Sequence, residues 1–405
     1  MDSLLQALRT ATAMYAADST SSALETENPW MSRPLPGPII EPVLQAIAVT
    51  PNIQVLTGLR QFSLGSSEVK PLYPRLLASA LVRRTHALSG PETAVQELLD
   101  LVAGNTGHAR VVMVLAGVQI SEPTEVEPGV QLASFKDLLP PSWMKDFVPE
   151  RWPLSRTFDP VAPSAALVAH IPFTPLFGGE GTTTGNFPEK TIAQLRTLAH
   201  CIALTAERPA AIFKVWFEND DPRLPLISSG VAFSDPRWGS TAAEPYVLDL
   251  TRFRATVASY RAFHGDLHPI ETALARLTEA WGGWRREERA IDLGIALEAI
   301  LMYTANGRNN DKSEINYKLR TRAAWLLGRN LSDRQTLFQQ VGRLYQFRSD
   351  AAHSGIVKTS ANTWQKTDDA IEAGIVLMGR IIATVLELGM WPDWDEIVLG
   401  GGSFV

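Results

Sequence analysis

The distribution of proline constrains the fold of this chain more than any other feature of its sequence. Of the 27 prolines, 25 precede Thr256, and the last 150 residues contain only Pro269 and Pro392. Proline lacks a backbone donor and clashes with the preceding helical turn, so it is excluded from helix interiors. The last third of the chain can therefore be almost entirely helical, whereas the first two-thirds cannot. Because 405 residues are enough for two domains, we expect one over residues 1–255 and another over residues 256–405.

Composition and charge narrow the class of protein. Hydrophobic residues make up 45% of the chain and charged residues 20%, which is typical of a soluble protein. The net charge of −6 argues against a protein that is basic overall and coats nucleic acid, but it allows a local basic patch. The single cysteine, Cys201, excludes a disulfide framework and favours the reducing cytoplasm.

The sequence favours neither a signal peptide nor a membrane span. Asp2 stands at the N-terminus, and no cationic segment leads into an apolar run there. The longest apolar segment, residues 375–391, is interrupted by Arg380 and Glu387. Such a segment is typical of a core helix and not of a membrane helix, so we expect no membrane partner.

The first region combines strand and helix patterns. Residues 111–115 form a continuous apolar run that suits a buried strand. Further strands are predicted over 130–135, 165–171, 210–217 and 246–250, and helices over 3–15, 74–88, 93–102 and 190–205. Loops are expected at 122–129 and 178–186. The predicted class is α+β, with a mixed domain that senses or regulates, followed by an all-α bundle.

The second region has the apolar periodicity of an up-and-down helical bundle. Helices are predicted over 257–281 with an interruption near Pro269, and over 285–304, 314–327, 332–355 and 363–388. For the third of these helices, Asp311 or Ser313 is the expected cap. For the fourth, Ser332 and Gln335 form a capping-box pattern, and Gly355 is a helix stop.

The fourth predicted helix of this bundle contains the residues best suited to chemistry. Arg348 continues the apolar stripe of that helix, and an arginine facing a core needs an anion, of which phosphate is one. His353 follows at the helix end, and histidine both accepts and donates protons near neutral pH. An arginine that forks onto phosphate oxygens and a histidine together suit RNA cleavage by its own 2'-hydroxyl, which requires no metal.

Two considerations limit this interpretation of Arg348 and His353. An arginine and a histidine at this spacing often occur by chance, and helix geometry separates the two side chains. Five residues correspond to about 140° around a helix, so the pair of one chain does not converge on a point. A two-fold partner would place two arginines and two histidines around one groove. The alternative is a structural pair at the end of the bundle.

Three segments carry a resemblance to a known family. RAIDLGIALEAIL, EINYKLRTRAAWLLG and LYQFRSDAAHSG resemble, in order and spacing, the Apea-like branch of the HEPN family, and the resemblance covers residues 285–389. It implies a helical bundle that dimerises and, in many members, a metal-independent ribonuclease with an Arg-x(4–6)-His motif at the dimer cleft. Arg348 and His353 match that motif. Ser349 stands where active members often have Asn, Asp or His.

The resemblance also implies roles and biology. His353 would be the general acid and base, Arg348 would stabilise the phosphorane, and Asp350 or Ser349 would orient the histidine. The products would carry a 2',3'-cyclic phosphate. The expected partners are RNA, with tRNA as one candidate, a second copy of the chain, and a phage or host protein that triggers the first domain during antiviral defence or stress.

Two other functions stay open at this point. One is a non-catalytic member of the family, whose bundle binds RNA, a nucleotide or a protein. The other places the function in residues 1–255 and makes the bundle a dimerisation device.

Charged and aromatic residues elsewhere in the bundle allow two interpretations each. Glu298 lies inside an apolar helix and needs a partner, with Lys318, Arg322 and Arg348 as candidates. The resulting ion pair either braces the bundle or positions Arg348 or His353. Lys318 and Arg322 share a predicted helix face and either follow a phosphate backbone or are simply solvated.

Aromatic residues and three weaker patterns complete the candidates. Tyr317 and Tyr345 either stack on RNA bases or pack at the core edge. His264 and His268 have zinc-like spacing, but Pro269 disrupts the turn, so we expect no metal and no cofactor. We expect His200 and Cys201 to be packing residues. The loop at 178–186 lacks the Gly-Lys-Ser/Thr ending of a phosphate loop.

Overall fold

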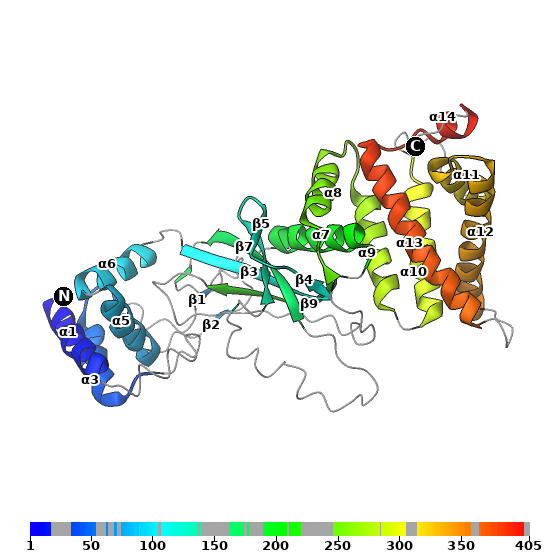
Figure 1. Cartoon of the computed structure of the whole chain (residues 1–405). Helices are drawn as coiled ribbons and strands as arrows, with labels where there is room; N and C mark the ends of the chain where they lie inside the picture. Colours follow the sequence, from blue (N-terminus) through cyan, green and yellow to red (C-terminus); the bar gives the residue numbers. More distant parts are fainter. Residues whose placement is uncertain are drawn as a thin grey trace.

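The chain folds into three consecutive groups of elements, a helical group, a sheet and a helical bundle (Figure 1). The computed structural model describes residues 1–17, 34–53, 62–63, 69–70, 74–88, 90–103, 107–135, 138, 163–173, 176–177, 189–208, 210–219, 246–283, 285–304, 314–357 and 364–400. The groups follow one another in chain order, with the N-terminus at one end of the molecule and the bundle at the other (Figure 1). The fold is therefore α+β, as the sequence predicted.

Among the residues that the structure describes, the N-terminal group has four helices that pack on one another. They are α1 (Asp2–Ala17), α3 (Gly37–Val49), α5 (Pro74–Leu88) and α6 (Pro91–Val102). Helix α3 was not predicted from the sequence because the segment is rich in proline. Pro38 lies at the helix start, where its missing N–H costs nothing. Pro42 lies farther in, and the burial of an apolar stripe, including Ile40 and Val43, compensates for it.

A five-stranded antiparallel sheet forms the centre, with strand order β5-β6-β7-β3-β9. Its strands are β3 (Gly107–Ala116), β5 (Thr124–Glu127), β6 (Val130–Ser134), β7 (Pro163–Phe173) and β9 (Ala211–Asn219). In β3, which lies between β7 and β9, Val112 is paired with Val168 on one side and Trp216 on the other. Val111 packs into the main core and Val112 into a small cluster on the other face. The apolar run of β3 is therefore buried on both faces, as predicted.

Two predictions for this region were wrong. The expected loop at 122–129 is part of a hairpin, because β5 pairs with β6 around Gly129, whose φ of 75° suits the turn. The expected strand at 246–250 shortens to β10 (Tyr246–Val247), since Asp249 caps a helix directly after it. The predicted loop at 178–186 lies outside the described residues.

Short strands flank the main sheet. β10 pairs in parallel with β4 (Val118–Gln119). A second small sheet joins β1 (Phe62–Ser63), β2 (Val69–Lys70) and β8 (Leu176–Phe177). The helix α7 (Glu189–Ala206) packs on β3, β7 and β9 (Figure 1). Within α7, His200 and Cys201 are buried, which confirms that both are packing residues.

The bundle begins earlier than the predicted boundary after residue 255. Its helices are α8 (Leu250–Ala262), α9 (His268–Gly282), α10 (Arg286–Leu301), α11 (Ile315–Leu327), α12 (Leu331–Ser354), α13 (Trp364–Leu388) and α14 (Trp394–Leu399). The predicted boundary falls inside α8, because this helix already begins at Leu250. Asp249 caps it by accepting hydrogen bonds from the N–H groups of Thr251 and Arg252. The predicted helix 257–281 is interrupted near Pro269, as expected. It forms two helices, because α8 ends at Ala262 and α9 begins at His268, with Pro269 in its first turn.

The ends of α12 show one correct and one incorrect prediction. Asn330 is the N-cap and accepts a hydrogen bond from the Asp333 N–H, so Ser332 lies in the first turn and does not cap. Gly355 ends the helix with a φ of 71°, as predicted. For α11, the expected caps Asp311 and Ser313 lie outside the described residues.

A polar contact joins the sheet to the bundle. Arg261 of α8 donates two hydrogen bonds to Glu127 of β5, at 2.7 and 3.0 Å, and Gln194 of α7 donates a third at 2.8 Å. Burial alone would raise the pKa of Glu127, but the hydrogen bonds from Arg261 and Gln194 outweigh it and lower that pKa. The buried apolar side chains also form one cluster across both regions.

The apolar segment predicted at 375–391 is a core helix. Its residues Ile375, Met378, Ile382 and Val385 in α13 are buried. Among the helices that the structure describes, none is long and apolar enough to cross a membrane.

Candidate functional site at the end of α12

Arg348 is the centre of a small charged cluster between α12 and α10. Its Nη2 lies 3.1 Å from the Oε1 of Glu298, and the two side chains are only 28% and 29% exposed. Of the three partners that the sequence offered for Glu298, the structure therefore selects Arg348. An ion pair on this half-buried boundary holds the guanidinium in a defined place.

A glycine on α10 makes room for this arginine. Gly294 lies four residues before Glu298 and so on the same helix face. A Cβ at Gly294 would lie 2.7 Å from the Cβ of Arg348 and closer still to its Cγ. The sequence analysis missed Gly294, although an isolated glycine inside an apolar helix usually has a packing reason.

Tyr345 completes the cluster. The guanidinium carbon of Arg348 lies 5.5 Å from the centre of the Tyr345 ring. Burial raises the pKa of Tyr345, and the charge of Glu298 and a hydrogen bond to it raise it further. These contacts favour the packing interpretation of Tyr345 over base stacking.

His353 lies apart from this cluster in the same chain. It is exposed in the last turn of α12, about 140° around the helix from Arg348. Asp350 accepts a hydrogen bond from Gln346 at 2.9 Å, and Ser349 is half-buried. One chain therefore presents an exposed imidazole and a separately held guanidinium.

Arg322 is not available for a nucleic-acid contact. Its side chain is buried, its Nη1 donates a hydrogen bond of 2.6 Å to the carbonyl of Leu301, and its guanidinium lies 5.2 Å from the Trp394 ring. Burial lowers the pKa of Arg322, and Asp395 partly offsets this. Lys318 and Arg322 share a face of α11, as predicted, but this face is not solvated, because Lys318 is half-buried and Arg322 is buried.

An exposed aromatic and a stacked arginine mark the α11–α12 surface instead. Tyr317 is 58% exposed, and its ring meets the edge of Phe338 at 6.0 Å. Arg320 also stacks on Phe338, with its guanidinium carbon 3.8 Å from the centre of the ring. Arg320 was not predicted, since only the packing of α11 on α12 reveals this stack.

The remaining sequence candidates do not form a metal site. The His264 N–H donates to the carbonyl of Gly389, and His268 is the first residue of α9. The residues that the structure describes contain no group of three His, Cys, Asp or Glu side chains that could hold a metal ion.

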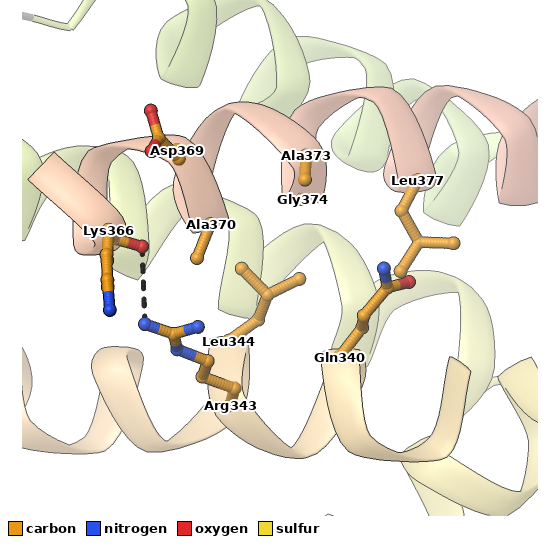
Figure 2. Close-up of a pocket in the computed structure, with 9 residues that line it drawn as sticks. All are labelled: Gln340, Arg343, Leu344, Lys366, Asp369, Ala370, Ala373, Gly374 and Leu377. Atoms are coloured by element: carbon orange, nitrogen blue, oxygen red, sulfur yellow. Dashed lines mark hydrogen bonds between the residues drawn. The ribbon is translucent and has the colours of Figure 1, made fainter. Parts of the chain in front are cut away.

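A groove between α12 and α13 was also not predicted from the sequence (Figure 2). Its volume is about 360 Å³. It forms where two consecutive helices pack side by side, and the sequence pattern of neither helix alone predicts it.

Comparison with known proteins adds no assignment. No family model, no curated protein and no solved structure matches this chain. The candidate site therefore rests on its residues and their geometry.

Replacing Gly294 with alanine should destabilise the protein. Alanine favours a helix by about 1 kcal/mol over glycine, but the new Cβ would overlap the stem of Arg348. We expect a net loss of about 1–3 kcal/mol in the free energy of unfolding, which urea denaturation measures.

Gly379 provides the matched control for this substitution. It also lies inside a helix, but a Cβ there would be 3.8 Å from Leu204, an ordinary contact. Gly379→Ala should therefore stabilise the protein by up to about 1 kcal/mol. If Gly294→Ala stabilises it equally, the close packing of Arg348 on α10 is wrong.

Proposed function

We propose that this protein is a metal-independent endoribonuclease of the HEPN type that acts as a homodimer. The observation that carries the proposal is the Arg348-x4-His353 pair itself. Gly294 and Glu298 of α10 hold Arg348 of α12 in place, and His353 is exposed in the last turn of α12. A half-buried charged side chain that specific contacts hold in place is typical of a functional site.

The proposed reaction is cleavage of RNA by its own 2'-hydroxyl. A neutral His353 accepts the proton of this hydroxyl, the 2'-oxygen attacks the adjacent phosphorus, and the bond from phosphorus to the 5'-oxygen breaks. A protonated histidine gives its proton to that leaving oxygen. Arg348 stabilises the negative charge of the phosphorane. The products are a 2',3'-cyclic phosphate and a 5'-hydroxyl.

The separation of Arg348 and His353 around α12 supports a shared site. Since the two side chains of one chain diverge, a two-fold partner supplies the groups that complete each constellation. Asp350 lies three residues before His353 on the helix, within reach of its imidazole, and Ser349 adjoins the motif arginine. Tyr317 and Lys318 are the proposed RNA contacts, and buried Arg322 is left out of that role.

The biological setting that fits this activity is cleavage of cytoplasmic RNA, including tRNA, during phage defence or stress. In this scheme the first region receives the trigger from a phage or host protein. The Arg261–Glu127 contact is one physical connection between that region and the bundle.

A non-catalytic RNA-binding module is the second candidate. One observation favours it, because Glu298 already neutralises Arg348 within the same chain. A guanidinium committed to a carboxylate has fewer donors for a phosphate.

Incubation of the purified full chain with total RNA and a metal chelator tests the proposal. We expect cleavage in the wild type, with cyclic phosphate ends detected by mass spectrometry. His353→Ala should lower the rate by about a hundredfold or more, because a general acid or base contributes at least that much.

The matched control is His264→Ala, which removes another exposed histidine outside the motif. This variant should cleave like the wild type. Equal cleavage by His353→Ala would contradict the proposal. RNA that is bound by the wild type but never cleaved would favour the non-catalytic module.

A further inference from the structure

The groove between α12 and α13 has a closed apolar floor. Leu344 of α12 packs against Gly374 of α13, where a Cβ would lie 2.5 Å from the Cδ2 of Leu344. This contact draws the two helices together and seals the bottom of the groove. Above it, Ala370 and Ala373 are too short to fill the space, and so a hollow of about 360 Å³ remains.

One end of the groove carries two cations. The Nη2 of Arg343 donates a hydrogen bond of 3.2 Å to the carbonyl of Lys366, and the Lys366 side chain extends toward α12 beside it (Figure 2). Asp369, although it lines the rim, points away from α12 (Figure 2). Within the described part of the chain, no carboxylate forms an ion pair with either cation.

Two further features strengthen the positive potential and fix the Arg343 guanidinium. Helix α13 begins at Trp364, so the positive end of a 25-residue helix lies near Lys366. Arg343 also lies over the Phe347 ring at 5.4 Å, which limits where its guanidinium can move. Two adjacent cations that no carboxylate of the described residues pairs with favour an anion between them.

The other end of the groove is polar without charge. Gln340 reaches from α12 toward Leu377 of α13, and its amide can both donate and accept (Figure 2). The groove therefore offers an anion site, an apolar floor and an amide, in that order. Its volume lies within the usual range for small-molecule sites, about 300–1,000 Å³.

We propose that this groove binds a small organic anion with a flat ring body. The acidic group lies between Arg343 and Lys366, the ring lies on Leu344 and Ala373, and a polar substituent meets Gln340. His353 follows Leu344 by nine residues and so lies on the opposite side of α12. Arg348 lies one turn after Leu344, but it is paired with Glu298 of α10.

Fluorescence titration with 8-anilinonaphthalene-1-sulfonate tests this site, since the probe joins a sulfonate to a flat ring system. Lys366→Gln should weaken binding by about fivefold, the effect of losing one partly screened charge. Ala373→Leu should weaken it at least tenfold, because the larger side chain fills the hollow. Both positions are exposed, so both variants should fold.

Lys190→Gln is the matched control, since Lys190 is also an exposed lysine in the first turn of a helix. It should leave the affinity unchanged. Uncharged N-phenyl-1-naphthylamine should bind the wild type more weakly than the sulfonate. The proposal is overturned if the wild type does not bind the sulfonate, or if Lys366→Gln and Ala373→Leu bind it like the control.

Discussion

Replacing Arg322 with alanine should lower the free energy of unfolding by about 3 kcal/mol. The substitution removes the donor to the Leu301 carbonyl at the last residue of α10, and it removes the cation from the Trp394 ring. It also leaves a cavity where a buried side chain stood. Carbonyls at helix C-termini lack partners within the helix, so a buried one needs an outside donor.

Urea denaturation of Arg322→Ala beside Arg329→Ala measures this effect. Arg329 is exposed two residues after the end of α11, so its loss should change stability by less than about 0.5 kcal/mol. Arg322→Lys should recover part of the loss, because it keeps a donor without the planar fork. If Arg322→Ala is as stable as Arg329→Ala but binds RNA more weakly, the structural role of Arg322 is wrong.

Acidification should destabilise the protein through His200. Burial and, to a smaller extent, the charge of Arg196 one turn earlier together lower the pKa of His200 to about 4. In the unfolded chain this pKa returns to about 6.5. Between these values the unfolded state binds a proton that the folded state does not, so stability falls as the pH drops from 6.5 toward 4. The expected loss is up to about 3 kcal/mol.

The comparison of wild type and His200→Gln from pH 7 to pH 4 measures this contribution. Glutamine cannot titrate, so the variant should lose less stability over this range than the wild type does. His264→Gln changes an exposed histidine and should keep the wild-type profile. Parallel profiles for the wild type and His200→Gln would show that His200 does not stay neutral in the folded protein.

The fold was predictable wherever one segment carried its own signal. The apolar run of β3 and the periodic helices from α10 to α13 were placed correctly because periodicity reports burial directly. Helix α3 was missed because proline composition outweighed its apolar stripe. The hairpin β5–β6 was missed because β5 is polar and becomes a strand only by pairing with β6.

The sequence identified candidate residues of the site, but it did not identify which of them contact one another. The sequence named Glu298 and three cations that might neutralise it, and the packing of α12 on α10 chose Arg348. It placed Lys318 and Arg322 on one face, but α14 and the end of α10 enclose Arg322. Gly294 makes room for Arg348 only because α10 and α12 are in contact, which the sequence of neither helix shows.

The sequence by itself determined the α+β class, the helical last third and the Arg348-x4-His353 spacing. The spacing is read directly from the chain. The class and the helical last third follow from the positions of the prolines and the periodicity of apolar residues, which are local properties of the sequence. Only the tertiary structure decided that Glu298 holds Arg348, that Arg322 is buried and that a groove opens between α12 and α13. Each of these depends on side chains from separate helices meeting, and the distance between helices is set by packing and not by local sequence.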